Sequence, residues 1–168
     1  FQVALNSRIY VDKTGLIEYT NSVLNTTNAY ICNSRPRRFG KSYAANMLAA
    51  YYSKGADSEK MFSELEIGKN EDFKKHLNKY DVIHIDIQWF LANCDDVDNV
   101  VKHIAEAVLD ELRVAYPGIL PPEIFSLPDA LSRIKDKTGQ KFIVIVDEWD
   151  VLIRDEAANK KAQEDYFL

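Results

Sequence analysis

The chain has 168 residues, of which 46% are hydrophobic and 28% are charged, and its formal net charge is −5. This composition is typical of a globular domain with a core of its own. The negative balance argues against a nucleic-acid-binding surface spread over the whole chain, and no apolar run reaches the roughly 18 residues of a membrane span.

Two cysteines, Cys32 and Cys94, lie far apart and lack metal-ligand spacing. They favour a reducing compartment over a disulfide scaffold or a zinc site. No signal peptide opens the chain. We therefore expect a cytoplasmic protein that does not contact the membrane.

The first half of the chain alternates short apolar runs with helix patterns. Residues 8–11 and 29–32 predict strands. Apolar residues at helical spacing predict helices over 16–24 and 41–52. The charged stretch 61–78 predicts a helical excursion.

The second half continues this alternation. Residues 81–89 are β-branched and mostly apolar, which predicts a strand buried on both faces. Helices are expected over 97–115 and 128–137, and residues 142–146 read as another strand. The alternation predicts an α/β fold with a mostly parallel sheet, helices on both faces, and ligands at the carboxyl ends of the strands.

One such strand end is the stretch 34–42, "SRPRRFGKS". Gly40, Lys41 and Ser42 match the second half of the phosphate-loop pattern G-x-x-x-x-G-K-[ST]. In this pattern the glycine permits close backbone approach, the lysine reaches the β- and γ-phosphates and the hydroxyl coordinates Mg²⁺, so we expect these roles of Gly40, Lys41 and Ser42. Arg35 stands where the first glycine is expected. Because proline follows Arg35, the start of the loop is stiff while its phosphate-facing half is intact.

The candidate binding residues also include Arg37, Arg38 and Phe39, between Arg35 and Gly40. The two arginines either add charge near the γ-phosphate or are simply solvated. A bare Gly-Lys-Ser also fits an ordinary capped helix start.

The other strand end carries paired acids. Residues 142–146 precede Asp147 and Glu148, which fits the Walker B pattern. Asp147 is expected at the Mg²⁺ water shell, and Glu148 as the general base that polarises the attacking water. A charged turn after a strand is the alternative, but the conjunction with the Walker A half favours nucleotide binding.

Three segments resemble the AAA-ATPase-like domain family: "YVDKTGLI" (10–17), "SRPRRFGKS" (34–42) and "VDEWD" (146–150). The resemblance implies ATP, Mg²⁺ and the three-layer P-loop fold. Its expected functional positions are matched by Lys41, Ser42, Asp147 and Glu148, with Lys41 and Glu148 catalytic. In that family the first loop position is ordinarily not glycine, so Arg35 is no departure; Trp149, where tyrosine is more common, is a mild one.

The resemblance also implies a strand that follows the Walker B strand in sequence, whereas only a polar helical stretch (155–166) is left here. We therefore expect residues 1–168 to form a single, incomplete P-loop domain, truncated after the Walker B strand. A gap beside strand 29–32 would then be left open, or filled by another chain or a rearranged segment. Members of the family commonly continue into a PD-(D/E)XK nuclease-like domain, which becomes the expected partner.

The resulting expectation is an ATPase module of a larger protein that binds no nucleic acid directly. The alternatives are a nucleotide-gated binding module with little turnover and, more weakly, a small-molecule kinase. Asp12 and Lys13 lie either near the nucleotide or in a helix cap with a local ion pair, and we favour the cap. Asp86 lies either near the metal or in a turn or cap, and we favour the turn or cap.

Overall fold

A computed structural model of the chain describes residues 1–34, 39–94, 97–154 and 164–166. The chain divides into two compact units, Phe1–Val82 and Ile83–Leu168. Each unit has its own set of buried apolar side chains. The candidate phosphate loop belongs to the first unit and the paired acids belong to the second.

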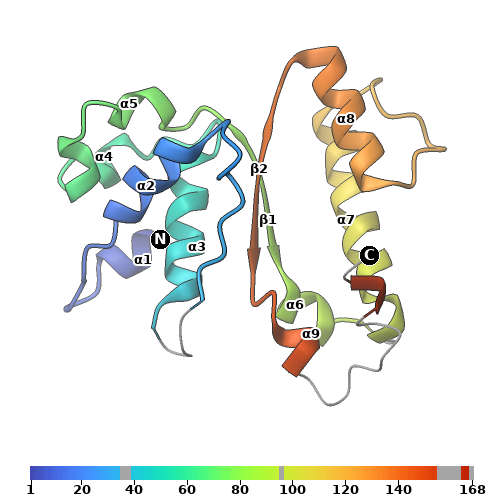
Figure 1. Cartoon of the computed structure of the whole chain (residues 1–168), viewed down its shortest axis with the longest axis horizontal. Coiled ribbons are helices and arrows are strands. Elements are labelled where there is room, and N and C mark those ends of the chain that lie inside the picture. Colours follow the sequence, from blue (N-terminus) through green and yellow to red (C-terminus); the bar gives the residue numbers. More distant parts are fainter. Residues whose placement is uncertain (35–38, 95–96, 155–163, 167–168) are drawn as a thin grey trace. The chain divides into compact units, whose positions relative to one another are not determined.

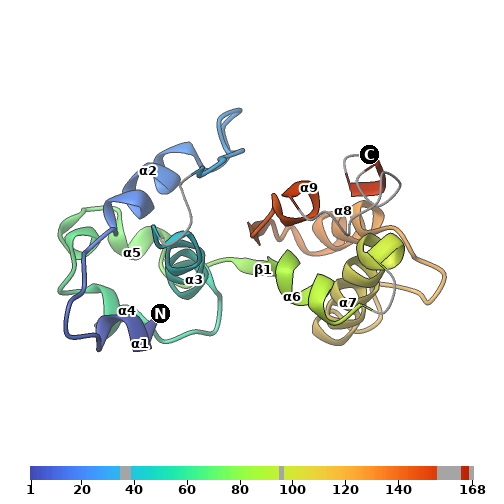
Figure 2. The same ribbon diagram turned by 90° about the horizontal axis from the view of Figure 1, so that it is seen from below.

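The first unit is built around α3 (Lys41–Tyr52). Its other elements are α1 (Gln2–Leu5), α2 (Gly15–Val23), α4 (Glu59–Phe62), the short 3-10 helix η1 (Glu66–Lys69) and α5 (Phe73–His76) (Figure 1). Figure 2 shows α3 nearly along its axis, with α1, α2, α4 and α5 grouped around it.

The C-terminal half of α3 holds this unit together through two buried tyrosines. The hydroxyl of Tyr51 donates to the carbonyl oxygen of Phe73 at 2.7 Å, which ties α3 to α5. The hydroxyl of Tyr52 donates to Oδ1 of Asn21 at 2.7 Å, which ties α3 to α2. Both phenols thus bury a large apolar ring and keep their polar end hydrogen-bonded.

The second unit combines a small sheet with helices. β1 (Asp81–Asp86), which begins at the end of the first unit, pairs in parallel with β2 (Phe142–Asp147) in a two-stranded sheet. The helices are α6 (Ile87–Ala92), the 3-10 turn η2 (Val97–Asn99), α7 (Val100–Ala115), α8 (Leu127–Thr138) and α9 (Val151–Arg154). The predicted α/β class is confirmed, whereas the three-layer P-loop arrangement remains a prediction.

The core of the second unit forms along α7. Val100, Ile104, Val108 and Leu112 recur at helical spacing and are buried, because they form the apolar stripe of an amphipathic helix. They belong to one apolar cluster with residues of β1, α8 and α9. This core positions the end of β2 and the acids that follow it.

Two predicted strands in the first unit are wrong. Residues 8–11 and 29–32 are irregular, and Ile9 and Tyr30 are 84% and 96% exposed. A strand is stable only when neighbouring strands satisfy its backbone. Neither segment pairs with another strand among the residues that the structure describes. Short apolar runs alone were therefore insufficient to predict strands.

Two other predicted elements have different boundaries. The strand expected over 81–89 ends at Asp86, because the Asp86 carboxylate accepts a hydrogen bond from the N–H of Trp89 at 3.0 Å and starts α6. The excursion 61–78 is helical but broken into short pieces. The preferred turn-or-cap interpretation of Asp86 is confirmed, because Asp86 is the N-cap of α6.

Candidate functional site

The segment that enters α3 has the backbone shape expected of an anion cradle. Gly40 is the N-cap of α3 and adopts the left-handed conformation, with φ 79° and ψ 35°. The first N–H groups of a helix have no partner within the helix and carry its positive dipole end. A left-handed residue followed by helical residues turns successive N–H groups toward one point. This geometry suits a phosphate group.

Lys41 and Ser42 form the first turn of α3, as the sequence predicts. Lys41 is partly exposed and Ser42 is exposed. Among the described residues, neither side chain has a hydrogen-bonding or ion-pair partner. An ammonium and a hydroxyl are thus available to a ligand at the helix start. Arg35, Arg37 and Arg38 lie outside the described residues, and what the sequence predicts for them stays a prediction.

A hollow of about 470 Å³ adjoins this helix start. One end is formed by Lys13, Phe39, Gly40 and Tyr43, and the remainder is mostly apolar, with Phe1, Tyr10, Val11 and Met47 among its residues. Sequence reasoning missed this hollow, because its walls come from the N-terminal segment and from α3. The motif "YVDKT" contributes three of its residues and was the signal that could have found it.

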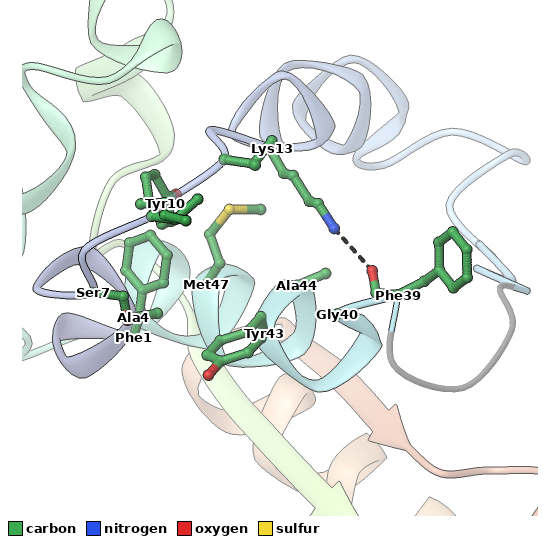
Figure 3. A pocket seen from close by; sticks show the side chains of 12 residues that line it. Phe1, Ala4, Ser7, Tyr10, Lys13, Phe39, Gly40, Tyr43, Ala44 and Met47 are labelled. Atoms are coloured by element: carbon green, nitrogen blue, oxygen red, sulfur yellow. Dashed lines mark hydrogen bonds between the residues drawn. The ribbon is translucent and has the colours of Figure 1, made fainter.

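Lys13 is the second feature that sequence reasoning placed differently. Its Nζ donates a 2.8 Å hydrogen bond to the carbonyl oxygen of Phe39, at the end of the loop (Figure 3). Asp12 instead accepts hydrogen bonds from the N–H and the hydroxyl of Thr14, at 2.8 and 2.7 Å. The predicted helix cap and local ion pair are therefore both wrong: Thr14 is the N-cap of α2, with no side-chain cap hydrogen bond, and Asp12 and Lys13 do not pair.

The second unit brings Asp147 and Glu148 together at the carboxyl end of β2. Asp147 is 7% exposed, and its Oδ1 accepts a 2.9 Å hydrogen bond from the N–H of Glu148. Glu148 has a φ of 51°, a left-handed conformation that is uncommon outside glycine. Residues held in sparsely populated backbone conformations cluster at functional sites. The roles of both acids remain predictions.

A metal site does not stand out from the side chains alone. Within the described ranges, no group of three or more His, Cys, Asp and Glu side chains could hold a metal ion. The proposed Mg²⁺ ligands, Ser42 and Asp147, are a hydroxyl and a carboxylate, which are the oxygen donors that Mg²⁺ prefers.

In the same described part of the chain, no helix is both long and apolar enough to cross a bilayer.

A left-handed glycine before a Lys-Ser helix start, and an acid pair after an apolar strand, define a candidate nucleotide-binding α/β protein. A family model described as a predicted AAA-ATPase matches residues 2–167. The chain belongs to this AAA-ATPase-like family, which supports a general ATPase-like role and nucleotide binding. No curated protein and no solved structure matches the chain.

Proposed function

We propose that this protein binds Mg-ATP at the start of α3 and hydrolyses it. The observation that carries the proposal is the left-handed Gly40 directly before the 12-residue helix α3. The side chains of Lys41 and Ser42 are available in the first turn of that helix. A capped helix start would explain the helix alone, but the family match over residues 2–167 points to a nucleotide.

The hollow supports this proposal by offering room for the nucleoside. Ligand pockets of about 300–1,000 Å³ with mostly apolar walls are typical of small-molecule sites, and the hollow measures about 470 Å³. Tyr43 lies one residue after Ser42 and lines the hollow. A nucleotide whose phosphates meet the N–H groups of α3 thus has apolar and aromatic surface next to it.

The two acids supply the hydrolytic half of the proposal. In this proposal Asp147 and Ser42 share one Mg²⁺ ion, which would neutralise the developing charge on the phosphates. Glu148 would orient and deprotonate the attacking water. These roles rest on the Walker B pattern and on the family resemblance. They require that the end of β2 lies beside the start of α3, as in the three-layer P-loop arrangement.

Calorimetric titration with ATP, together with phosphate release, tests the proposal. Lys41→Ala is expected to abolish measurable ATP binding, whereas Glu148→Gln retains binding and loses turnover. Lys60→Ala, which removes an exposed lysine on α4, is the matched control and should change neither. Equal loss of binding in the Lys41 and Glu148 variants would contradict the assigned roles. Retained ATP with no phosphate release by the wild type would instead identify the nucleotide-gated module.

The metal ligands need a test of their own. If Ser42 and Asp147 bind the same ion, Ser42→Ala and Asp147→Asn should each weaken ATP binding in Mg²⁺ more than in its absence. The double variant should then lose little more than either single variant, because the substitutions remove ligands of one ion. Fully additive losses would show that the two residues do not share a metal.

The family resemblance also supports a larger parent protein with a PD-(D/E)XK nuclease-like partner domain. Limited proteolysis of the natural full-length protein should then release a second protected fragment outside residues 1–168. A parent protein without such a fragment would contradict this part of the proposal.

A further inference from the structure

The ammonium group of Lys13 occupies the space that Gly40 leaves open. Its Nζ lies 2.8 Å from the carbonyl oxygen of Phe39, and a Cβ added at Gly40 would come within 3.1 Å of it. Figure 3 shows the Lys13 side chain extended along the hollow toward the start of α3. A cation from the N-terminal segment therefore lies beside the backbone that the proposed function assigns to phosphate.

Asp12 and Thr14, the two neighbours of Lys13 in sequence, hold its backbone on η1. Oδ2 of Asp12 accepts the N–H of Glu66 at 2.8 Å, and Oγ1 of the fully buried Thr14 accepts the N–H of Ile67 at 3.1 Å. Asp12 and Thr14 are thus held on η1, while Lys13 between them extends to the loop. The triplet Asp12-Lys13-Thr14 acts as an anchored support for one ammonium group.

The hydrogen bonds that Asp12 accepts also keep its carboxyl group ionised. Partial burial raises the pKa of the Asp12 carboxyl, but hydrogen bonds from the Glu66 N–H and from Thr14 outweigh burial and lower it. The carboxylate is therefore committed to the backbone of η1 and to Thr14. Within the described part of the chain, Lys13 forms no ion pair.

The donor capacity of Lys13 is only partly used. A lysine ammonium has three N–H donors, and the Phe39 carbonyl takes one among the described residues. Lys13 also lines a hollow of about 470 Å³, together with Gly40 and Tyr43. Lys41, on the first turn of α3, supplies a second lysine in the same unit. Two lysines without carboxylate partners suit an anionic ligand, and the family match independently indicates a nucleotide.

We propose that Lys13 is a second phosphate-binding lysine, which contacts the phosphate group nearest the nucleoside. The proposal rests on the proposed function, because it requires that a nucleotide binds at the start of α3. Lys13 lines the hollow whereas Lys41 does not, so Lys13 lies on the nucleoside side of the cradle. Its ammonium keeps the bond to Phe39 and donates to a phosphate oxygen, so that it both positions the loop and binds the ligand.

Equilibrium titration with ADP, at low and at high salt, tests this role. Lys13→Gln retains a donor for the Phe39 carbonyl but removes the charge. We expect its ADP affinity to fall about tenfold or more, as for a lost charge-assisted hydrogen bond. The affinity should also become less dependent on salt, because one exposed charge pair has been removed. Lys13→Arg should recover part of the affinity, and the exposed-lysine control Lys54→Gln should bind like the wild type.

The outcomes separate this proposal from the proposed function. Wild-type affinity in Lys13→Gln would overturn the role of Lys13 alone. A weakened Lys13→Gln variant with an unchanged salt dependence would overturn it too, because it would show that the side chain only supports the loop. Absence of ADP and ATP binding by the wild type would overturn both proposals. Circular dichroism of each variant confirms that the fold is retained.

Discussion

The hydroxyl group of Tyr52 lies 2.7 Å from Oγ1 of Thr20, and this contact joins α3 to α2 inside the first unit. Tyr52 is 2% exposed. Tyr52→Phe should lower the free energy of unfolding by about 1 kcal/mol, because it leaves buried polar groups with one partner fewer. Urea denaturation measures the loss. Tyr30→Phe, at a position that is 96% exposed, is the control, and equal stability of the two variants would contradict the prediction.

The same phenol predicts a pH dependence. Burial raises the pKa of Tyr52 above its usual value of 10.0. The folded state therefore holds this proton more tightly than the unfolded state, so stability is fully present below about pH 10 and falls as the pH rises further. Urea denaturation between about pH 8 and 11 should show this decline in the wild type and a shallower decline in Tyr52→Phe. Parallel curves for the two proteins would show that other groups cause the decline.

Gly40→Ala should separate backbone strain from ligand binding. At a φ of 79° an alanine is strained, which costs about 1 kcal/mol of unfolding free energy. The added Cβ also displaces the Lys13 ammonium and narrows the approach to the N–H groups of α3, so ATP affinity should fall about tenfold. Gly55→Ala is a matched control, because its φ is 84° and its Cβ would meet nothing within 4 Å. Equal ATP affinity in both variants would refute the cradle.

Substitutions of Glu148 can distinguish the cost of its backbone conformation from the role of its carboxylate in ATP turnover. Its left-handed φ of 51° is one that glycine adopts without steric cost, so Glu148→Gly should raise the unfolding free energy by up to about 1 kcal/mol relative to Glu148→Gln. Both variants should lose ATP turnover, because both lack the carboxylate. Thermal unfolding and phosphate release distinguish the two effects. A glycine variant that is less stable than the glutamine variant would show that the side chain, and not the backbone, dominates at this position.

Local patterns predicted the elements that depend on local interactions. The bounds of α3, 41–52, follow from its apolar spacing and the glycine before it, and Gly139, with a φ of 71°, closes α8 where the sequence places a helix end. Residues 29–32 have a strand-like composition but are irregular. Strand pairing is non-local, and a four-residue run contains no information about a distant partner.

In the candidate site, too, the sequence predicted the local features but not the long-range contact. Gly40, Lys41 and Ser42 occupy the helix start that the motif predicts, because the motif encodes backbone conformation and adjacent side chains. For Lys13, sequence reasoning favoured the adjacent Asp12 as a partner. The structure instead pairs it with Phe39, 26 residues away. Proximity in sequence is a poor guide for a long side chain whose neighbours are already held by hydrogen bonds.

The continuity of α3 links ligand occupancy to folding. The helix begins at the proposed cradle and ends at Tyr51 and Tyr52 in the core of the first unit, so one rigid segment serves both. A nucleotide at a hundredfold its dissociation constant would stabilise that unit by about 2.7 kcal/mol. Conversely, a substitution that loosens the tyrosines would mimic a binding defect while leaving every ligand-contacting group intact.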